Sequence, residues 1–365
     1  MSAVKSVLVV GGGIAGMCAA IELRKRGIDV DLVEADPEWR VYGAGITVSA
    51  PSLRAFQRVG ALETILEQGA ASEGLDLFLA NGAPLGTIPG LPVAGSSIKS
   101  SAGILRPALA RILGEATVAA GTRVKLGSTF SPLSLTDGST QQYDLVIGAD
   151  GINSKVRAAL FPEAPKPRYT GQVCWRAVAP RPASLQRAEM YLGGKIKAGI
   201  VPVSKTEIYL FFLEARETAE HIDAARWPEL LRQALAGFGG HVAAIRESLT
   251  AESRIVYRPL YALMLPQPWH RGRVVLIGDA AHATTPHLAS GAGLAVEDAI
   301  VLAEELETAQ SCEEALHRFT ARRYERCRLV VENSVRLGDL EQSGGSPQEH
   351  EQLMRESTGA LAAAI

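Results

Sequence analysis

The stretch that decides the fold is VLVVGGGIAG, residues 7–16. It begins with a β-branched run typical of a short buried strand and ends in glycines that interrupt the strand. Helix-forming residues follow as far as Arg26, the helix is expected to end at Gly27, and residues 28–34 alternate between apolar and polar positions. This order of strand, glycine-rich turn, helix and strand predicts a βαβ unit, and therefore an α/β fold.

The glycines match the dinucleotide pattern Gly-x-Gly-x-x-Gly, directly after a strand and at the start of a helix. Gly11 allows the tight turn, Gly13 lets backbone amides approach a pyrophosphate, and Gly16 allows the helix to pack closely on the strand. Glu34, at the end of the second strand, is expected to accept hydrogen bonds from an adenosine ribose. The pattern alone does not separate FAD from NAD, and a glycine-rich turn in another α/β protein stays the alternative.

Composition sets limits on the class of protein. The chain has 365 residues, of which 47% are hydrophobic, so it can bury a sizeable core and form two domains. Lysine and arginine number 37 against 39 acidic residues, and this balance argues against a partner such as nucleic acid or anionic lipid. The four cysteines form no Cys-x-x-Cys pair, which argues against a metal site or disulfide scaffold. Glycines and charges interrupt the apolar start, so we expect a cytoplasmic protein without a membrane span.

The rest of the chain contains two further groups of strands. Residues 144–147 and 273–277 are apolar runs followed by Gly and Asp, and both are predicted to join the first sheet. Residues 171–179 and 191–213 alternate around turn signals, which predicts an inserted antiparallel sheet, and residues 81–101 are expected to cross to it.

Helices are expected near the end of the chain. Residues 292–306 and 313–337 carry long helical patterns, and from Gly344 onward we expect a loop and a weakly held terminal helix.

Two motifs beyond the first resemble those of a known family. Residues 148–157 read GADGINSKVR, and residues 278–286 read GDAAHATTP. With the glycine-rich turn, and in this order, they resemble the class A flavin monooxygenases, which include the 4-hydroxybenzoate, salicylate, 6-hydroxynicotinate and urate hydroxylases. The resemblance covers nearly the whole chain. It implies an FAD monooxygenase driven by NADH or NADPH and O2, which hydroxylates a small aromatic or N-heteroaromatic substrate through a flavin C4a-hydroperoxide.

The resemblance also implies the domain organisation. We expect a Rossmann-like FAD-binding domain with an inserted antiparallel β-sheet substrate domain and C-terminal helices. The FAD-binding domain with the C-terminal helices would comprise residues 1–75, 102–165 and 270–365, and the substrate domain residues 76–101 and 166–269.

Three charged residues take cofactor roles by this resemblance. Asp279 would bind the ribityl hydroxyls of the flavin, or it caps a helix. Asp150 would serve FAD and nicotinamide binding, or it caps the helix that reaches Arg157. Arg106 would pair with the diphosphate, or it is a surface arginine at a helix start.

Further cofactor contacts follow from the same resemblance. Thr47 ends a run of small residues expected beside the flavin ring, and Phe130 stands where relatives place valine near the adenine. The loop into the helix from residue 292 is expected to point backbone amides at the flavin N1/O2 edge, although Ala289-Ser290-Gly291 replaces the usual Gly-Gln-Gly. The remaining predicted cofactor contacts are Ala15, Ala35, Pro286, Ala289, Gly291, Ala292 and Gly293.

Substrate contacts are predicted on the inserted sheet and on the loop after Pro286. Tyr209 is expected to orient a ring hydroxyl or heterocyclic nitrogen, with ordinary sheet packing as the alternative. Lys197 would attract an acidic substrate, or it is a solvated charge. His287 would act as donor, acceptor or base, or it is a solvated loop histidine. His282 is expected to be structural.

Other functions compete with this reading. A flavin reductase, dehydrogenase or halogenase would carry much the same cofactor motifs, although no Trp-x-Trp-x-Ile-Pro halogenase motif occurs. A nucleotide-binding regulator is a third class. The sequence names neither the substrate nor the preferred nicotinamide cofactor, and leaves monomer and homodimer open.

Overall fold

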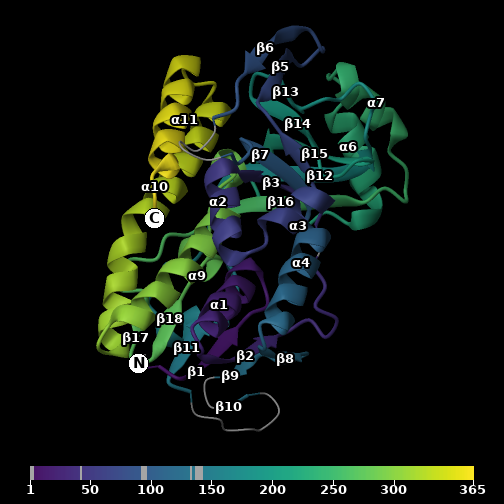
Figure 1. The fold of residues 1–365 in the computed structure, drawn as a ribbon. Helices are drawn as coiled ribbons and strands as arrows, with labels where there is room; N and C mark the ends of the chain where they lie inside the picture. The colour runs from purple at the N-terminus through teal and green to yellow at the C-terminus, as the bar shows by residue number, and fades with distance from the viewer. Residues whose placement is uncertain (1–3, 42, 92–96, 132–133, 136–142) are drawn as a thin grey trace.

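The computed structural model describes residues 4–41, 43–91, 97–131, 134–135 and 143–365. Two large sheets lie in different halves of the molecule, and long C-terminal helices run beside both (Figure 1).

The first half is built on a six-stranded sheet. All its neighbouring strands pair in parallel except the edge pair β17–β18. The two later strands predicted to join the first sheet do so, on the side of β1 away from β2. In spatial order the strands are β17 (His270–Arg271), β18 (Val274–Leu276), β11 (Leu145–Gly148), β1 (Ser6–Val10), β2 (Asp29–Glu34) and β8 (Arg123–Leu126).

Helices α1 (Ile14–Lys25), α4 (Arg106–Ala119) and α9 (Gly291–Thr308) pack together beside this sheet. Residues 15–23 of α1 are all buried, since the helix lies between its neighbours and the sheet. Such a helix shows little amphipathic periodicity, because almost every face meets protein.

The second half is built on a seven-stranded sheet. The strands predicted around residues 171–179 and 191–213 are confirmed, with turns near Gly194 and Ser204. The prediction of a wholly antiparallel sheet is wrong at one pair, because β5 comes from a distant part of the chain and runs parallel to β13. In spatial order the strands are β16 (Ile255–Ala262), β12 (Arg168–Pro180), β15 (Glu207–Ala215), β14 (Ile196–Pro202), β13 (Ala188–Gly193), β5 (Leu75–Leu79) and β6 (Pro84–Ile88).

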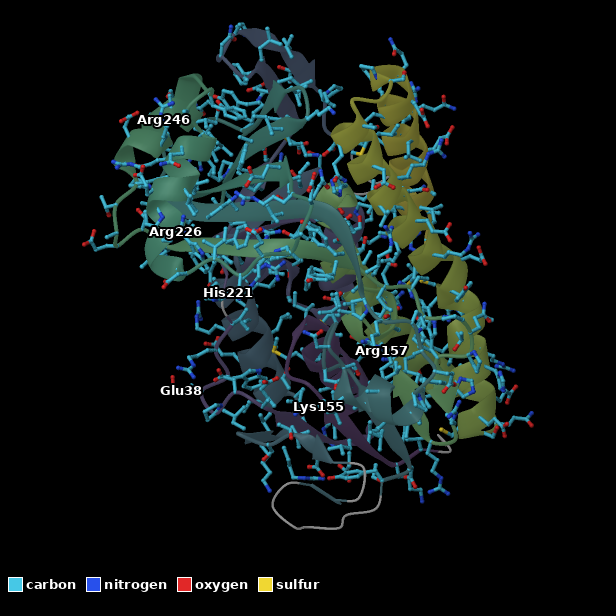
Figure 2. All side chains as sticks on the ribbon, turned by 180° about the vertical axis from the view of Figure 1, so that it is seen from behind. Glu38, Lys155, Arg157, His221, Arg226 and Arg246 are labelled. Carbon is cyan, nitrogen blue, oxygen red and sulfur yellow. The ribbon has the colours of Figure 1, made fainter. Side chains whose placement is uncertain are left out.

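One face of this sheet is covered by the helical layer of α6 (Trp227–Ala234) and α7 (Gly240–Ser248), with the short η1 (Ala224–Arg226) before them. Figure 2 shows Arg226 and Arg246 on this layer, at the outer side of the molecule. The opposite face of the sheet is therefore the one that can meet the first half of the molecule.

Short elements connect the two halves. A three-stranded sheet has the order β3, β7, β4, and β14 contacts both β7 and β4. These strands and the remaining short elements of the chain are β3 (Gly45–Ser49), α2 (Ala50–Val59), α3 (Leu62–Gln68), β4 (Ala70–Ser72), β7 (Ser101–Leu105), β9 (Phe130–Ser131), β10 (Ser134–Leu135), α5 (Lys155–Leu160), α8 (Asp279–His282) and η2 (Pro286–Leu288).

The C-terminal helices extend along both halves. Helix α10 (Cys312–Ser343) contacts α9 in the first half and β12 in the second, and ends at Gly344 in the left-handed conformation (φ 70°). The terminal helix α11 (Pro347–Ala362) is longer and better packed than the sequence predicts, because Leu353 and Leu361 are buried. Among the described residues, no helix combines the length and apolar character that crossing a bilayer requires.

Candidate cofactor and substrate site

A cavity of about 350 Å³ opens where β1 and β2 end. The glycines shape it as predicted. Gly11 has φ +109°, and a Cβ there would lie 2.3 Å from the Ala149 carbonyl oxygen, while a Cβ at Gly16 would lie 1.9 Å from the Gly11 carbonyl oxygen. A Cβ at Gly13 would meet nothing within 4 Å, so this turn leaves open space against its backbone, as a bound pyrophosphate requires.

Glu34 and Ala35 line the same cavity. One Glu34 carboxylate oxygen accepts a hydrogen bond from the Gly12 amide (2.7 Å), and the other accepts from the Asp36 amide (2.8 Å). The carboxylate therefore holds the turn in place while its remaining lone pairs stay available for a ribose hydroxyl. The side chain of Phe130 lies outside the described residues.

Asp150 also lines this cavity, but its carboxylate caps α5. It accepts hydrogen bonds from the Ser154 hydroxyl and from the amides of Lys155 (2.7 Å) and Val156 (3.1 Å). Asp150 therefore caps α5 in the structure, which was the alternative to a cofactor role. Arg157, near Lys155 in Figure 2, is buried and donates to the carbonyl of Ala280 at 2.9 Å, which fastens this motif to α8.

A larger cavity of about 600 Å³ lies between the first half and the uncovered face of the seven-stranded sheet. It brings together most of the predicted site residues from segments far apart in the sequence. These are Gly13, Ala15, Thr47, Arg106, Lys197, Tyr209, Asp279, Pro286, His287, Ala289, Gly291 and Ala292.

Among the cofactor contacts predicted at the start of α9, Gly293 does not line the larger cavity. A Cβ at this position would lie 2.0 Å from the Ser52 hydroxyl oxygen, so the glycine allows α9 to pack against α2. Gly293 therefore serves helix packing, and its contact with the cofactor stays a prediction.

Asp279 and Arg106 are oppositely charged residues that both line this cavity. Asp279 is the first residue of α8, its side chain is open to the cavity, and it makes no capping hydrogen bond, so the capping alternative is wrong here. Burial within the surrounding protein raises the pKa of the Asp279 carboxyl. Arg106 begins α4 but is not a surface residue, and burial together with nearby Arg176 lowers its pKa. Both side chains are available to a ligand.

The loop between α8 and α9 adopts an unusual backbone. Ala289 lies in the left-handed region with φ 47°, where relatives of the resembled family place glycine. A non-glycine residue there costs about 1 kcal/mol. The eighteen-residue α9 begins at Gly291 beside the cavity.

Tyr209 connects the sheet to the first half. Its hydroxyl lies 3.3 Å from the Thr47 hydroxyl, and its ring packs so closely on Gly45 that a Cβ there would lie 2.4 Å from the ring. Burial raises the pKa of the Tyr209 phenol, so it is a neutral hydrogen-bonding group at pH 7. The contact places Tyr209 beside the segment expected to border a flavin ring.

Lys197 and His287 both contact Glu341 of α10, a residue that the sequence did not predict for the site. Lys197 forms an ion pair with Glu341, and His287 Nε2 lies 3.4 Å from Glu341 Oε2 without an aligned hydrogen bond. The His287 side chain is 1% exposed and its Nδ1 lies 2.9 Å from the Thr285 hydroxyl. The solvated alternatives for both residues are therefore wrong. Burial lowers the pKa of His287, which keeps it neutral.

Glu341 stays ionised in this cluster. Burial opposes ionisation, but the nearby imidazoles of His287 and His350 and the charge of Lys197 hold the pKa of Glu341 well below the usual range. The His350 Nε2–Glu341 Oε1 distance is 3.1 Å, so α11 also joins the cluster. A carboxylate in a long amphipathic helix carries no sequence signal that distinguishes it from a solvated one.

A second buried ion cluster lies behind the α8 motif. Asp298 accepts hydrogen bonds from the Gly278 amide (2.9 Å), His282 Nε2 (2.6 Å) and Arg323 Nε (2.8 Å). Despite burial, the charges of His282 and Arg323 lower the pKa of Asp298 to about 2. His282, 1% exposed, is structural, as predicted. Potential metal-ligand atoms of His282, Asp298 and Cys327 lie within 4.8 Å of one another, but protein cations already neutralise the carboxylate.

The comparisons with known proteins agree with this arrangement. The family described as FAD binding domain matches residues 5–334. Over 350 residues the chain is 34% identical to a 2-heptyl-3-hydroxy-4(1H)-quinolone synthase of Pseudomonas aeruginosa, covering 92% of this chain and 90% of that protein. It is 30% identical over 354 residues to 3-amino-4-hydroxybenzoate 2-monooxygenase of Streptomyces cremeus, covering 91% and 86%. Klebsiella pneumoniae HpxO complexed with FAD and uric acid has the same fold, with a TM-score of 0.83 at 24% identity over 98% of this chain and 94% of that one.

Proposed function

Because this chain belongs to the FAD-binding family of FAD-dependent monooxygenases, we propose that it uses NADH or NADPH and O2 to hydroxylate a small aromatic or N-heteroaromatic substrate. One observation carries the proposal. The large cavity is continuous from Asp279 and the start of α9 to Tyr209 on the seven-stranded sheet, so a flavin ring and a substrate ring can share it.

The residues present fit FAD. The open space at Gly13 and the carboxylate of Glu34 suit the adenosine and pyrophosphate end, while Asp279 and Arg106 suit the ribityl and phosphate groups in the larger cavity. When bound, FAD supplies the reduced ring that activates O2 and delivers one oxygen atom.

The chain's own residues would orient the substrate and exclude water. The Tyr209 hydroxyl can donate to, or accept from, a ring hydroxyl or ring nitrogen while its phenol packs on Gly45. Apolar neighbours such as Val201, Phe211 and Leu213 line the same cavity and limit access of water to the reacting ring. The backbone amides at the start of α9 would favour negative charge on the reduced ring.

We further propose that the half built on the six-stranded sheet binds the cofactor and the half built on the seven-stranded sheet binds the substrate. The first half, with residues 1–75, 102–165 and 270–365, would hold the cofactor, and residues 76–101 and 166–269 would shape the substrate pocket. No second dinucleotide fingerprint is present in the sequence, which is consistent with transient docking of NADH or NADPH. The cytoplasmic location and the choice between monomer and homodimer stay predictions.

Oxygen labelling tests the proposed function. The purified, FAD-loaded protein is supplied with NADH or NADPH under ¹⁸O2 and a panel of phenolic acids, hydroxypyridines and quinolones. We expect substrate-stimulated NAD(P)H oxidation and one ¹⁸O atom in the product. Oxidised product without ¹⁸O would instead identify a dehydrogenase and overturn the monooxygenase proposal.

A further inference from the structure

Arg176 is a cation of the large cavity that the sequence did not single out. It lies on β12, where Val173, Trp175 and Ala177 pack into the core beneath the helical layer. Because side chains alternate along a strand, Arg176 lies on the opposite face, and it lines the cavity. The register places it opposite Phe211 of β15, so its position in the sheet is fixed by backbone pairing.

The Arg176 guanidinium makes no hydrogen bond or ion pair with the part of the chain that the structure describes, whereas the neighbouring charges have counterparts. Lys197 is paired with Glu341, and Arg106 shares its surroundings with Asp279. The remaining acidic residue of the lining, Glu189, is turned away.

The Glu189 carboxylate belongs to the opposite side of the sheet. It accepts a hydrogen bond from the Tyr191 hydroxyl at 2.7 Å, and its Oε1 lies 2.9 Å from His241 Nδ1. It therefore does not compensate Arg176. Burial raises the pKa of Tyr209 and the charge of Arg176 opposes that rise, while burial and the charge of Arg176 together lower the pKa of Arg106, so Arg176 lies within electrostatic range of both the cofactor half and the phenol.

A partly buried guanidinium without a counterion is unfavourable, and an anion that enters the same low-dielectric space gains strong attraction. The planar guanidinium matches a carboxylate through two parallel N–H···O bonds. Arg176 and Tyr209 lie on adjacent strands and line one cavity, so a single ring could present a carboxylate to the first and a hydroxyl or ring nitrogen to the second.

We propose that Arg176 is the anchor for a substrate carboxylate, so that the substrate is an aromatic or N-heteroaromatic acid. This inference rests on the proposed function and narrows its substrate class. It separates two kinds of relative, since the 3-amino-4-hydroxybenzoate in the name of one carries a carboxylate and the 2-heptyl-3-hydroxy-4(1H)-quinolone in the name of the other does not.

Equilibrium binding to the FAD-loaded protein, without NAD(P)H, tests the anchor apart from catalysis. Changes in flavin absorbance report binding of matched pairs: 6-hydroxynicotinate against 2-hydroxypyridine, 4-hydroxybenzoate against phenol, and 4-hydroxyquinoline-2-carboxylate against 4-hydroxyquinoline. We expect each acid that binds to bind at least about tenfold more tightly than its neutral partner, the effect typical of a hydrogen-bonded charge pair. Arg176→Gln should abolish most of this preference, and Arg176→Lys should restore part of it.

Arg168→Gln is the matched control, because Arg168 is exposed at the start of the same strand. It should leave the preference and the FAD content unchanged. Equal affinity for acids and neutral partners, binding of none of the acids, or an unchanged preference in Arg176→Gln would overturn the proposal. Loss of FAD from Arg176→Gln with the preference intact would assign the arginine to the cofactor. Selective acid binding without ¹⁸O incorporation would retain the anchor and reject the monooxygenase function.

Discussion

Replacement of Asp298 by asparagine should destabilise the protein substantially. The carboxylate is fully buried and meets two cations, His282 and Arg323, together with the Gly278 amide. Its pKa of about 2, against an ordinary 3.8, corresponds to about 2 kcal/mol of stabilisation. Breaking a buried ion pair costs about 3–5 kcal/mol because a charge is left uncompensated. We expect about 3 kcal/mol, since Glu297 still pairs with Arg323.

Urea denaturation of the FAD-loaded protein measures this effect as a difference in the free energy of unfolding. Asp339→Asn, an exposed position on α10, is the control and should change it by less than about 0.5 kcal/mol. The folded pKa of Asp298 is depressed, so its contribution is present above pH 4 and is lost as the pH falls towards 2. A loss below 1 kcal/mol at pH 7 in Asp298→Asn would refute the view that this ion cluster is strongly coupled.

Three further substitutions test the cofactor and substrate sites. Asp279→Ala should weaken FAD binding about 10- to 100-fold, measured by flavin fluorescence titration, because a charged hydrogen-bond acceptor is lost; unchanged affinity would remove the ribityl assignment. Tyr209→Phe should lower product formed per NAD(P)H oxidised and raise peroxide release, and unchanged coupling would return Tyr209 to a packing role. Gly13→Ala should fold but bind FAD more weakly, whereas Gly16→Ala should fail to fold, as circular dichroism and gel filtration would show. Equal behaviour of the two variants would contradict the assignment of open space to Gly13 and of close packing to Gly16.

The first half of the fold could be predicted because its signals are local or strongly patterned. A glycine-rich turn after a β-branched run is typical of the strand–turn–helix start of a βαβ unit. The apolar runs before Gly148 and Gly278 are typical of strands that are buried on both faces of a sheet. The parallel pairing of β5 with β13 could not be predicted, since no local signal relates residues 75–79 to residues 188–192.

Within the site, several of the residues could be predicted from the sequence, but the residues that contact them could not. Tyr209 and Asp279 stand in recognisable strand and turn contexts, and the structure brings both to one cavity. The partner of Lys197 and His287 could not be predicted, because Glu341, which contacts both, lies more than fifty residues beyond the loop. Arg176 resembles any polar residue in an alternating strand. Asp150 shows the converse, because a motif carboxylate also serves as an ordinary helix cap.

The spatial order of the six-stranded sheet has a consequence for biosynthesis. Strand β1 is synthesised before its neighbour β11, which follows more than a hundred residues later, and before β18, which follows more than two hundred and sixty residues later. Asp279 and the start of α9 follow later still. The nascent chain therefore carries an exposed apolar sheet edge, first that of β1 and then that of β11, until β18 is made, and it cannot complete the cofactor site before α9 is made. We expect chaperones and FAD supply to affect the yield of folded protein during this interval.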